Sequence, residues 1–234
     1  MSKRKKLNSK AFSGAYSSVA SVLLGLLVSV VFVVFSSDLG IINSISLLFS
    51  SLWEGSFGSK NSFIETLVFA TPLIFTGLAH SVAFKTGLFN IGVEGQFIIG
   101  MLMAALIGII PGIPPVLHVI LVLLASGLGG ALWAAIPGYL KAKTGSNEVV
   151  NTIMMNFIAM YLSNYIVGRI KASGTEATPL IESSARLWRF LGPGYRLSIG
   201  IFLALILVIG VYYLLWKTTV GYELRAVGFN VFAS

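Results

Sequence analysis

A polar, glycine-rich octet, FNIGVEGQ, stands at the start of a long apolar run. Its first polar residue, Asn90, is a good helix N-cap, and its glycines leave the backbone open to close approach. At membrane depth such a break offers hydrogen-bonding groups and a positive helix end, which transporters use around polar solutes. A capped helix start at the cytoplasmic interface explains the octet equally well, with Glu94 favoured by the helix dipole. The residues of the octet that we expect along a solute path are Phe89, Asn90, Gly92, Glu94, Gly95 and Gln96.

A second polar segment, residues 145–156 with the sequence GSNEVVNTIMMN, opens another apolar run. Asn147, Asn151 and Asn156 include pairs four and five residues apart, so part of one helical face carries amides into the membrane. Because unsatisfied amides are costly in lipid, this face is expected to point into the protein. This face serves either helix–helix hydrogen bonding or a solute path.

A third segment, residues 218–230 with the sequence TTVGYELRAVGFN, directly follows the last apolar run. It is short and mildly amphipathic. This pattern fits a helix on the cytoplasmic side that docks on a soluble partner, although a plain tail has the same composition.

The sequence offers little for covalent chemistry. It contains no G-x-x-x-x-G-K-[ST] motif and therefore no P-loop for ATP. His80 and His118 are far apart, without cysteine or metal-ligand spacing nearby, which argues against a metal site. No G-x-S-x-G or H-E-x-x-H motif indicates a hydrolase. We therefore expect neither an enzyme nor a cofactor.

These segments belong to a chain that is too apolar to have an ordinary water-facing surface. Charged residues make up 10% and hydrophobic residues 56% of its 234 residues, whereas soluble domains carry about 25% charged residues. Uncharged runs of about 20 residues predict transmembrane helices. The predicted spans are 16–35, 63–84, 88–110, 116–139, 149–168 and 197–216. We predict an all-α, polytopic membrane protein with about six spans in a single domain, residues 1–234.

Two longer connections are expected to hold short elements. The apolar, serine-rich stretch Ile41–Trp53 fits an interfacial or re-entrant helix. Within residues 169–196, Leu187–Leu191 fits a short amphipathic helix on the membrane surface. For both connections an ordered extracellular loop is the simpler interpretation. Small residues in the fourth span, residues 125–131, predict close packing by a neighbouring helix.

The basic residues set the expected orientation. A cluster precedes the first span, comprising Lys3, Arg4, Lys5, Lys6 and Lys10. The apolar run that follows is too long for a signal-peptide core of about 7–15 residues, so the first span is expected to be retained. With a cytoplasmic N-terminus, more basic residues fall inside than outside, as the positive-inside rule requires. We predict a multi-pass plasma-membrane protein whose net charge of +8 needs no nucleic-acid partner.

Together, the three polar segments resemble the permease subunits of bacterial ABC importers for nucleosides, within the larger family that serves ribose, simple sugars and branched-chain amino acids. FNIGVEGQ carries the resemblance most specifically, GSNEVVNTIMMN nearly as well, and GYELRAVGFN is similar to the family's ATPase-contacting segment. The resemblance runs from about residue 63 to the C-terminus. It implies that the first two segments line the translocation path, at Asn90, Gly92, Glu94, Gly95 and Gln96 in the octet and at Glu148, Asn151 and Asn156 in the second segment. Phe89 is a candidate for stacking on a base or sugar, as aromatic rings generally can. The resemblance assigns the coupling to the ATPase to Gly221, Glu223, Arg225, Gly228 and Asn230.

The resemblance also implies an assembly of several chains. The expected partners are a cytoplasmic ABC ATPase, a second permease subunit and an extracellular lipoprotein that binds the solute, with no cofactor in this subunit. Family members continue past the coupling segment with further spans, so we expect either a truncated gene product or a partial sequence of a longer family domain. Two alternatives stay open. One is an ion- or proton-coupled secondary transporter that uses Glu94 or Glu148 as the coupling acid, and the other is a non-transporting membrane scaffold.

Overall fold

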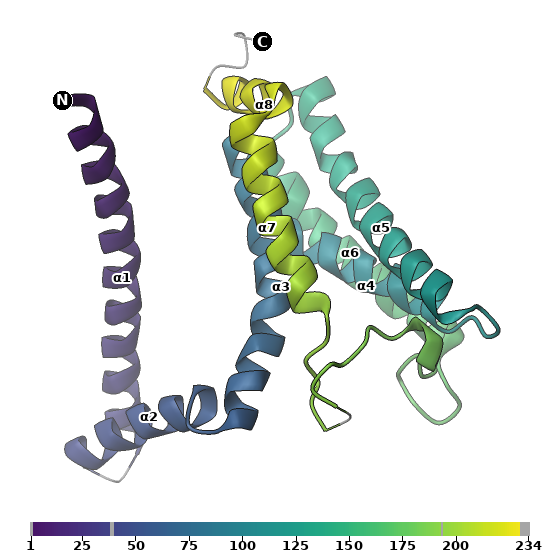
Figure 1. Cartoon of the computed structure of the whole chain (residues 1–234), viewed down its shortest axis with the longest axis horizontal. Helices are drawn as coiled ribbons and strands as arrows, with labels where there is room; N and C mark the ends of the chain where they lie inside the picture. The colour runs from purple at the N-terminus through teal and green to yellow at the C-terminus, as the bar shows by residue number, and fades with distance from the viewer. Residues whose placement is uncertain (1, 38–39, 193, 230–234) are drawn as a thin grey trace. The chain divides into compact units, whose positions relative to one another are not determined.

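The computed structural model describes residues 2–37, 40–192 and 194–229, and within the first helix the side chains of Tyr16 and of Val19 onward. Every regular element in these ranges is helical, which confirms the predicted all-α class (Figure 1). Along the chain they are α1 (Ser2–Ser36), α2 (Ile41–Ser56), α3 (Lys60–Lys85), α4 (Val93–Gly108), α5 (Pro115–Thr144), α6 (Glu148–Ile170), the short 3₁₀ helix η1 (Ser183–Ala185), α7 (Gly200–Lys217) and α8 (Thr219–Phe229).

The surface of the long helices is that of a protein that lies in lipid. Large apolar side chains stand exposed along them, among them Leu73, Leu132 and Ile209 at 70%, 69% and 68%. In water, apolar patches of this extent would drive aggregation. By length and composition, α1, α3, α5 and α7 are able to cross a membrane, and α4 is a shorter apolar helix. The chain is therefore a multi-pass membrane protein.

Each predicted span coincides with a helix, but the third prediction, residues 88–110, is too long. Gly87 adopts a φ of 77° and residues 86–92 are not helical, so α4 has only 16 residues. At about 1.5 Å per residue it is roughly 24 Å long, which is less than the hydrocarbon core of about 30 Å. The fourth span, in contrast, extends further than predicted, because α5 continues through Pro137 until Gly145 ends it in the left-handed conformation.

The chain divides into a first compact unit that ends at Thr66 and a second that begins at Leu67. The first unit consists of α1, α2 and the start of α3. At the corner between α1 and α2, the hydroxyls of Ser37 and Ser44 share a hydrogen bond of 2.5 Å, and Ser44 is fully buried. α2 confirms the helix expected over Ile41–Trp53, and its place at the membrane interface stays a prediction.

In the second unit, α4 packs between α5 and α6. Ile99 of α4 packs against Ala159 of α6, and Trp133 of α5 covers the same cluster. The small residues of α5 allow this approach. A side-chain carbon added at Gly129 would lie 2.6 Å from Cγ of Met103, so only glycine fits there without a shift. The packing predicted for the small residues of the fourth span is thus confirmed.

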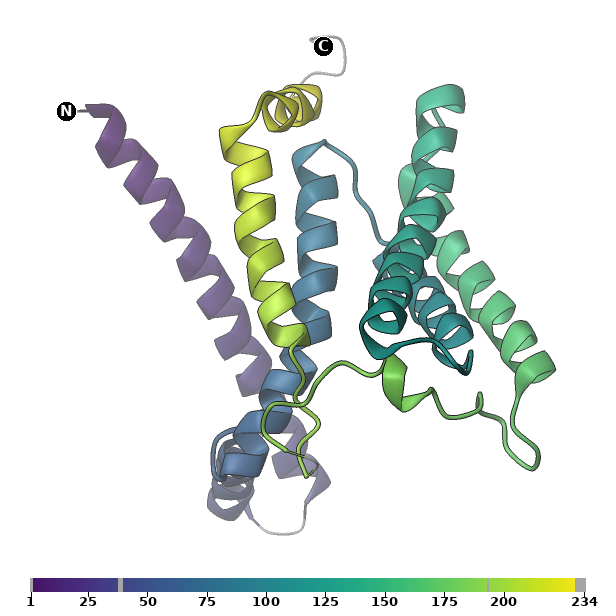
Figure 2. The same ribbon diagram turned by 45° about the vertical axis from the view of Figure 1, so that its right-hand side comes forward.

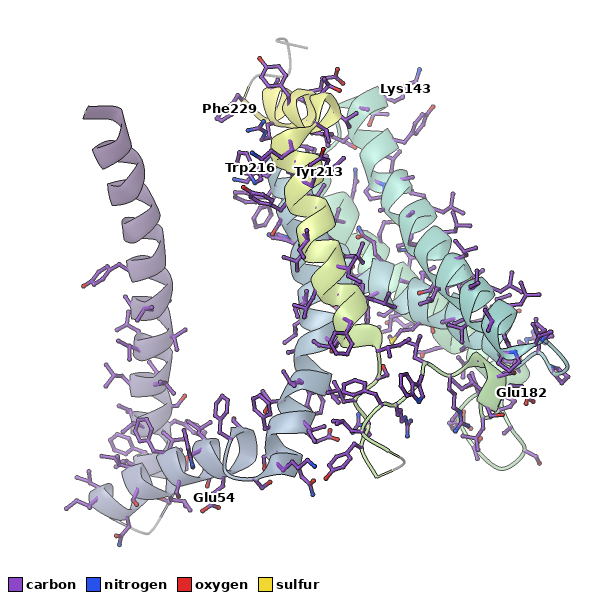
Figure 3. The ribbon with its side chains drawn as sticks, in the orientation of Figure 1. Glu54, Lys143, Glu182, Tyr213, Trp216 and Phe229 are labelled. Carbon is purple, nitrogen blue, oxygen red and sulfur yellow. The ribbon has the colours of Figure 1, made fainter. Side chains whose placement is uncertain are left out.

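The two ends of the second unit differ in what they carry. Lys143 of α5 and Phe229 of α8 lie at one end, and Glu182 lies at the other (Figure 3). α3 and α7 run side by side between them (Figures 1 and 2). The end with Lys143 also bears the ion pair and the short C-terminal helix described below, as expected of the predicted cytoplasmic side.

The connection from α6 to α7 is an ordered loop in which η1 is the only helix among the described residues. This confirms the ordered loop, the simpler interpretation, and the short amphipathic helix considered for Leu187–Leu191 does not form. The carbonyl of Trp188 accepts instead from the distant backbone N–H of Ile199 at 3.0 Å, which keeps the segment extended. Fully buried His118 fastens the loop to α5, since its Nδ1 lies 2.8 Å from the hydroxyl of Ser184.

Candidate functional site

The first half of the octet, residues 89–92, lies in the connection between α3 and α4, and its second half forms the first turn of α4. This connection runs from one end of the second unit into its interior (Figure 2). α4 begins at Val93 with Gly92 as its N-cap, so the expectation that Asn90 is the N-cap is wrong. Asn90 closes a turn instead. Its side-chain oxygen Oδ1 accepts from the backbone N–H of Gly92 at 2.9 Å and from Nε2 of Gln96 at 3.3 Å. The octet is thus a polar break in the helical backbone.

A histidine of α3 holds the first half of the octet in place. His80 Nδ1 lies 3.0 Å from the backbone carbonyl oxygen of Asn90. A carbonyl only accepts, so Nδ1 carries the proton and donates it to this bond. The ring also meets Phe89 edge-on, with centroids 5.7 Å apart. His80 was considered at the sequence level only as a metal ligand, and nothing in its spacing signalled this positioning role.

The second polar segment fastens α6 to the same break. Asn156 Oδ1 accepts from the backbone N–H of Gly95 at 2.8 Å, and its Nδ2 donates to the carbonyl of Ile91 at 3.0 Å. Both octet glycines allow this contact. A side-chain carbon at Gly92 would lie 3.0 Å from Cβ of Thr152, and one at Gly95 would lie 3.0 Å from Cα of Asn156. The amide of Asn156 therefore serves helix–helix hydrogen bonding, one of the two roles expected for it.

Residues of α3, α4, α5, α6 and the octet enclose a cavity of about 400 Å³, within the range of about 300–1,000 Å³ typical of small-molecule sites. Four of the predicted site residues line it, namely Phe89, Asn90, Gln96 and Glu148. The other lining residues are Ala79, Val82, Ala83, Leu88, Ala134, Pro137, Gly138, Lys141 and Thr152. We call this space the octet cavity.

An ion pair lines the octet cavity. Lys141 Nζ, near the end of α5, lies 2.7 Å from a carboxylate oxygen of Glu148, the first residue of α6. The hydrogen bond from Lys141 lowers the pKa of Glu148 below its ordinary value, so the carboxylate stays ionised at neutral pH. Sequence reasoning missed Lys141, although the flanking of left-handed Gly145 by two opposite charges was a signal for this pairing.

The remaining predicted residues lie outside the octet cavity. Glu94 is exposed in the first turn of α4 and has no hydrogen-bond or ion-pair partner among the described residues. Asn151 donates from Nδ2 to the hydroxyl of Ser146 at 2.6 Å. Gly92 and Gly95 are buried at the contact with α6. None of these four residues lines the octet cavity, and neither does Asn156. Gly92 is nevertheless joined to cavity-lining Asn90 by the hydrogen bond given above.

A larger cavity of about 880 Å³ adjoins the octet cavity, since both are lined by Ala79, Gln96 and Ala134. Its walls come from α3, α4, α5 and α7, and from Leu187 and Ser198 of the loop before α7. Most of this wall is apolar. Gln96 is consequently the single polar side chain that lines both spaces.

The predicted coupling segment forms α8, which follows α7 after a sharp turn. Gly221 is buried at that turn, where an added side-chain carbon would overlap the backbone of the last turn of α7. The guanidinium of Arg225 lies 4.4 Å from the ring centroid of Trp216 in α7, a cation–π contact. Glu223 is exposed. Asn230, the last residue predicted for this segment, lies outside the described residues.

The far end of α8 touches the start of the octet connection. A side-chain carbon added at Gly228 would overlap the carbonyl oxygen of Lys85 and lie 3.0 Å from the backbone nitrogen of Gly87. Likewise, a side-chain carbon added at Gly87 would lie 3.2 Å from Cα of Gly228. The two glycines therefore place backbone directly against backbone.

Over residues 62–234 the chain matches the family described as the permease component of branched-chain amino acid transport systems. The chain belongs to this family. The match includes the octet, the second polar segment and α8, all of which lie within those residues. No solved structure matches the chain significantly.

Curated relatives of the family include transporters for different solutes. The guanosine ABC transporter permease protein NupP of Bacillus subtilis is 41% identical over 195 residues, which are 82% of this chain and 56% of NupP. The nucleoside ABC transporter permease protein NupB of Lactococcus lactis is 34% identical over 225 residues, 89% of this chain and 62% of NupB. The glucose ABC transporter permease protein TsgB13 of Haloferax volcanii is 34% identical over 184 residues, 74% of this chain and 48% of TsgB13. The chain thus spans roughly half of the length of these relatives.

Proposed function

We propose that this chain forms part of the solute path of an ABC importer for nucleosides or related polar solutes. The observation that carries the proposal is the octet cavity, in which an aromatic ring, two carboxamides and an ion pair line one space inside an otherwise apolar bundle. Polar groups inside a membrane domain are costly and mark solute pathways. The names of NupP and NupB point to nucleosides as the solute.

The two adjoining cavities give the proposed path a direction. The larger one reaches the loop at Leu187 and Ser198, and the octet cavity reaches the ion pair of Lys141 and Glu148. A solute would pass Gln96 at their junction. Glu94 faces neither cavity, so its place in the path rests on the octet motif alone.

The proposed partners follow from the family and from α8. A cytoplasmic ABC ATPase would dock on α8, whose exposed face includes Tyr222 and Glu223. A second permease subunit and an extracellular lipoprotein that delivers the solute complete the assembly. The N-terminus lies on the ATPase side in this arrangement, because the basic cluster precedes the first span.

Uptake of radiolabelled uridine tests the proposal, in a strain that lacks the gene and carries it back on a plasmid. Phe89→Ala is expected to lower uptake several-fold at unchanged membrane abundance, because the ring lines the octet cavity. The matched control is Phe157→Ala, which removes an exposed ring of α6 that lines neither cavity. No uridine uptake by the wild type, or equal loss in both variants, would refute the proposal.

The energy source separates the proposal from its rivals. Uptake should stop when the P-loop lysine of the partner ATPase is replaced and should persist with a protonophore. Collapse with the protonophore alone would instead indicate a secondary transporter using Glu94 or Glu148. A scaffold predicts no change of uptake on deletion. Because TsgB13 is named for glucose, labelled glucose is the second solute to measure. Uptake of glucose without uridine would refute the proposal for nucleosides and point to a sugar as the solute instead.

A further inference from the structure

The side-chain carboxamides of Asn90 and Gln96, which both line the octet cavity, have a fixed orientation of donor and acceptor. The backbone N–H of Gly92 only donates, and it lies 2.9 Å from the side-chain oxygen of Asn90. This bond orients the amide of Asn90. Gln96 then has to present its Nε2 to the same oxygen, at 3.3 Å, because two oxygens would repel each other. The orientation of both amides thus follows from a single backbone N–H.

In this orientation one acceptor and one donor of the two carboxamides have no hydrogen-bond partner in the described part of the chain. Gln96 Oε1 and Asn90 Nδ2 make no hydrogen bond within the described part of the chain. In that part of the chain, no fully buried side-chain nitrogen or oxygen lacks a partner. Both atoms therefore keep accessible surface, and both residues line the octet cavity. An unmatched acceptor and donor next to one another call for a ligand with the complementary pair.

We infer that Asn90 and Gln96 read the lactam edge of a nucleobase, an N–H donor beside a C=O acceptor. The inference rests on the proposed function and names the solute chemistry that this site selects. Gln96 Oε1 accepts from the ring N–H, and Asn90 Nδ2 donates to the neighbouring carbonyl. Phe89 lines the same cavity and offers an aromatic face to the planar base.

The fixed orientation of donor and acceptor distinguishes this ligand from close alternatives. Cytidine has nearly the shape of uridine, but its edge is reversed, with a ring nitrogen that accepts and an amino group that donates. Against Asn90 and Gln96 it would face donor with donor and acceptor with acceptor. A sugar hydroxyl both donates and accepts, so it would not be sorted by polarity, and it has no planar face for Phe89.

Competition between nucleosides tests the inference, with uptake of labelled uridine measured against unlabelled uridine and unlabelled cytidine. The wild type should favour uridine over cytidine about tenfold, the usual effect of leaving a polar group unmatched. Gln96→Met keeps the size of the side chain but removes the acceptor, and should bring the ratio close to one. Because the same delivering partners serve every variant, a changed ratio reports on this chain.

Two further variants separate recognition from structure. In Gln96→Glu the carboxyl donates to Asn90 and keeps a free carbonyl oxygen only while it is protonated, so the preference for uridine should be larger at low pH and should fall as the carboxyl ionises. Asn164→Leu removes an exposed amide of α6 outside both cavities and should leave the ratio unchanged. An equal preference in the wild type and Gln96→Met overturns the inference while the proposed function stands. Absence of uridine uptake in the wild type overturns both.

Discussion

Gly95 is the position at which a single methyl group should loosen the break between α3 and α4. A side-chain carbon there would lie 2.9 Å from Oδ1 of Asn156, 3.0 Å from its Cα and 3.1 Å from the carbonyl oxygen of Met155. Carbon atoms in good contact stand about 3.5–4.0 Å apart. Two of the three atoms belong to the backbone of α6, so that helix has to move by several tenths of an ångström.

The expected cost follows from three terms. Overpacking costs about 1–3 kcal/mol. The two hydrogen bonds of Asn156 to the break would be strained, and each contributes about 0.5–1.5 kcal/mol. Replacing glycine by alanine within a helix returns about 1 kcal/mol. Gly95→Ala should therefore destabilise the chain by about 1–3 kcal/mol, which lowers Tm by about 5 °C for a chain of this size.

Thermal unfolding of the purified protein in detergent measures this difference. Gly168→Ala in α6 is the matched control, because nothing lies within 4 Å of the added carbon, and it should not lower Tm. Adding Asn156→Ala to Gly95→Ala should not restore Tm, since the backbone contacts persist. If Gly95→Ala unfolds at the temperature of the control, or if trimming Asn156 rescues it, the close approach of α4 and α6 is not what holds the break.

Two further predictions concern the end of the second unit that carries Lys143 and Phe229. Lys141→Ala removes the partly exposed ion pair with Glu148 and should cost at most about 1 kcal/mol at pH 7. Because Lys141 lowers the pKa of that carboxyl, the difference in Tm from the wild type should vanish as the pH falls through the folded pKa. A difference in Tm that persists in acid would contradict this origin. Gly228→Ala should displace α8 from the octet connection and reduce ATP-driven uptake at normal membrane abundance. Gly210→Ala is the control, because the added carbon meets open space, and it should not reduce uptake. Normal uptake in Gly228→Ala would show that the contact between Gly87 and Gly228 is dispensable.

The helices could be predicted from the sequence because helices that cross a lipid bilayer need long uncharged runs, and this chain contains such runs. The third span was overestimated for the same reason. Leu88, Phe89 and Ile91 prolong the apolar run, but the backbone around them is set by Gly87 and by the turn that Asn90 closes. Hydropathy does not register either feature. A local glycine and an asparagine two residues before the N-cap outweighed the apolar side chains.

The candidate site was predictable only in part. Phe89, Asn90 and Gln96 could be found because they are polar or aromatic residues within one short motif. Lys141 and His80 could not, because each acts on a segment brought to it by tertiary packing. Sequence periodicity places a residue on its own helix, but it does not show which neighbouring helix that residue meets.

The contact between Gly87 and Gly228 has a mechanical consequence. Where side chains lie between two segments, changes of rotamer can absorb small displacements of one segment before they reach the other. Here no side chain intervenes, and close-packed backbone is nearly incompressible. Because the two backbones are in direct contact, a displacement of α8 by less than an ångström would also displace the connection that carries Phe89 and Asn90. Because Gly87 and Gly228 have no side chains, this contact is stiff. A stiff contact is what the transmission of a movement from a partner bound to α8 would require.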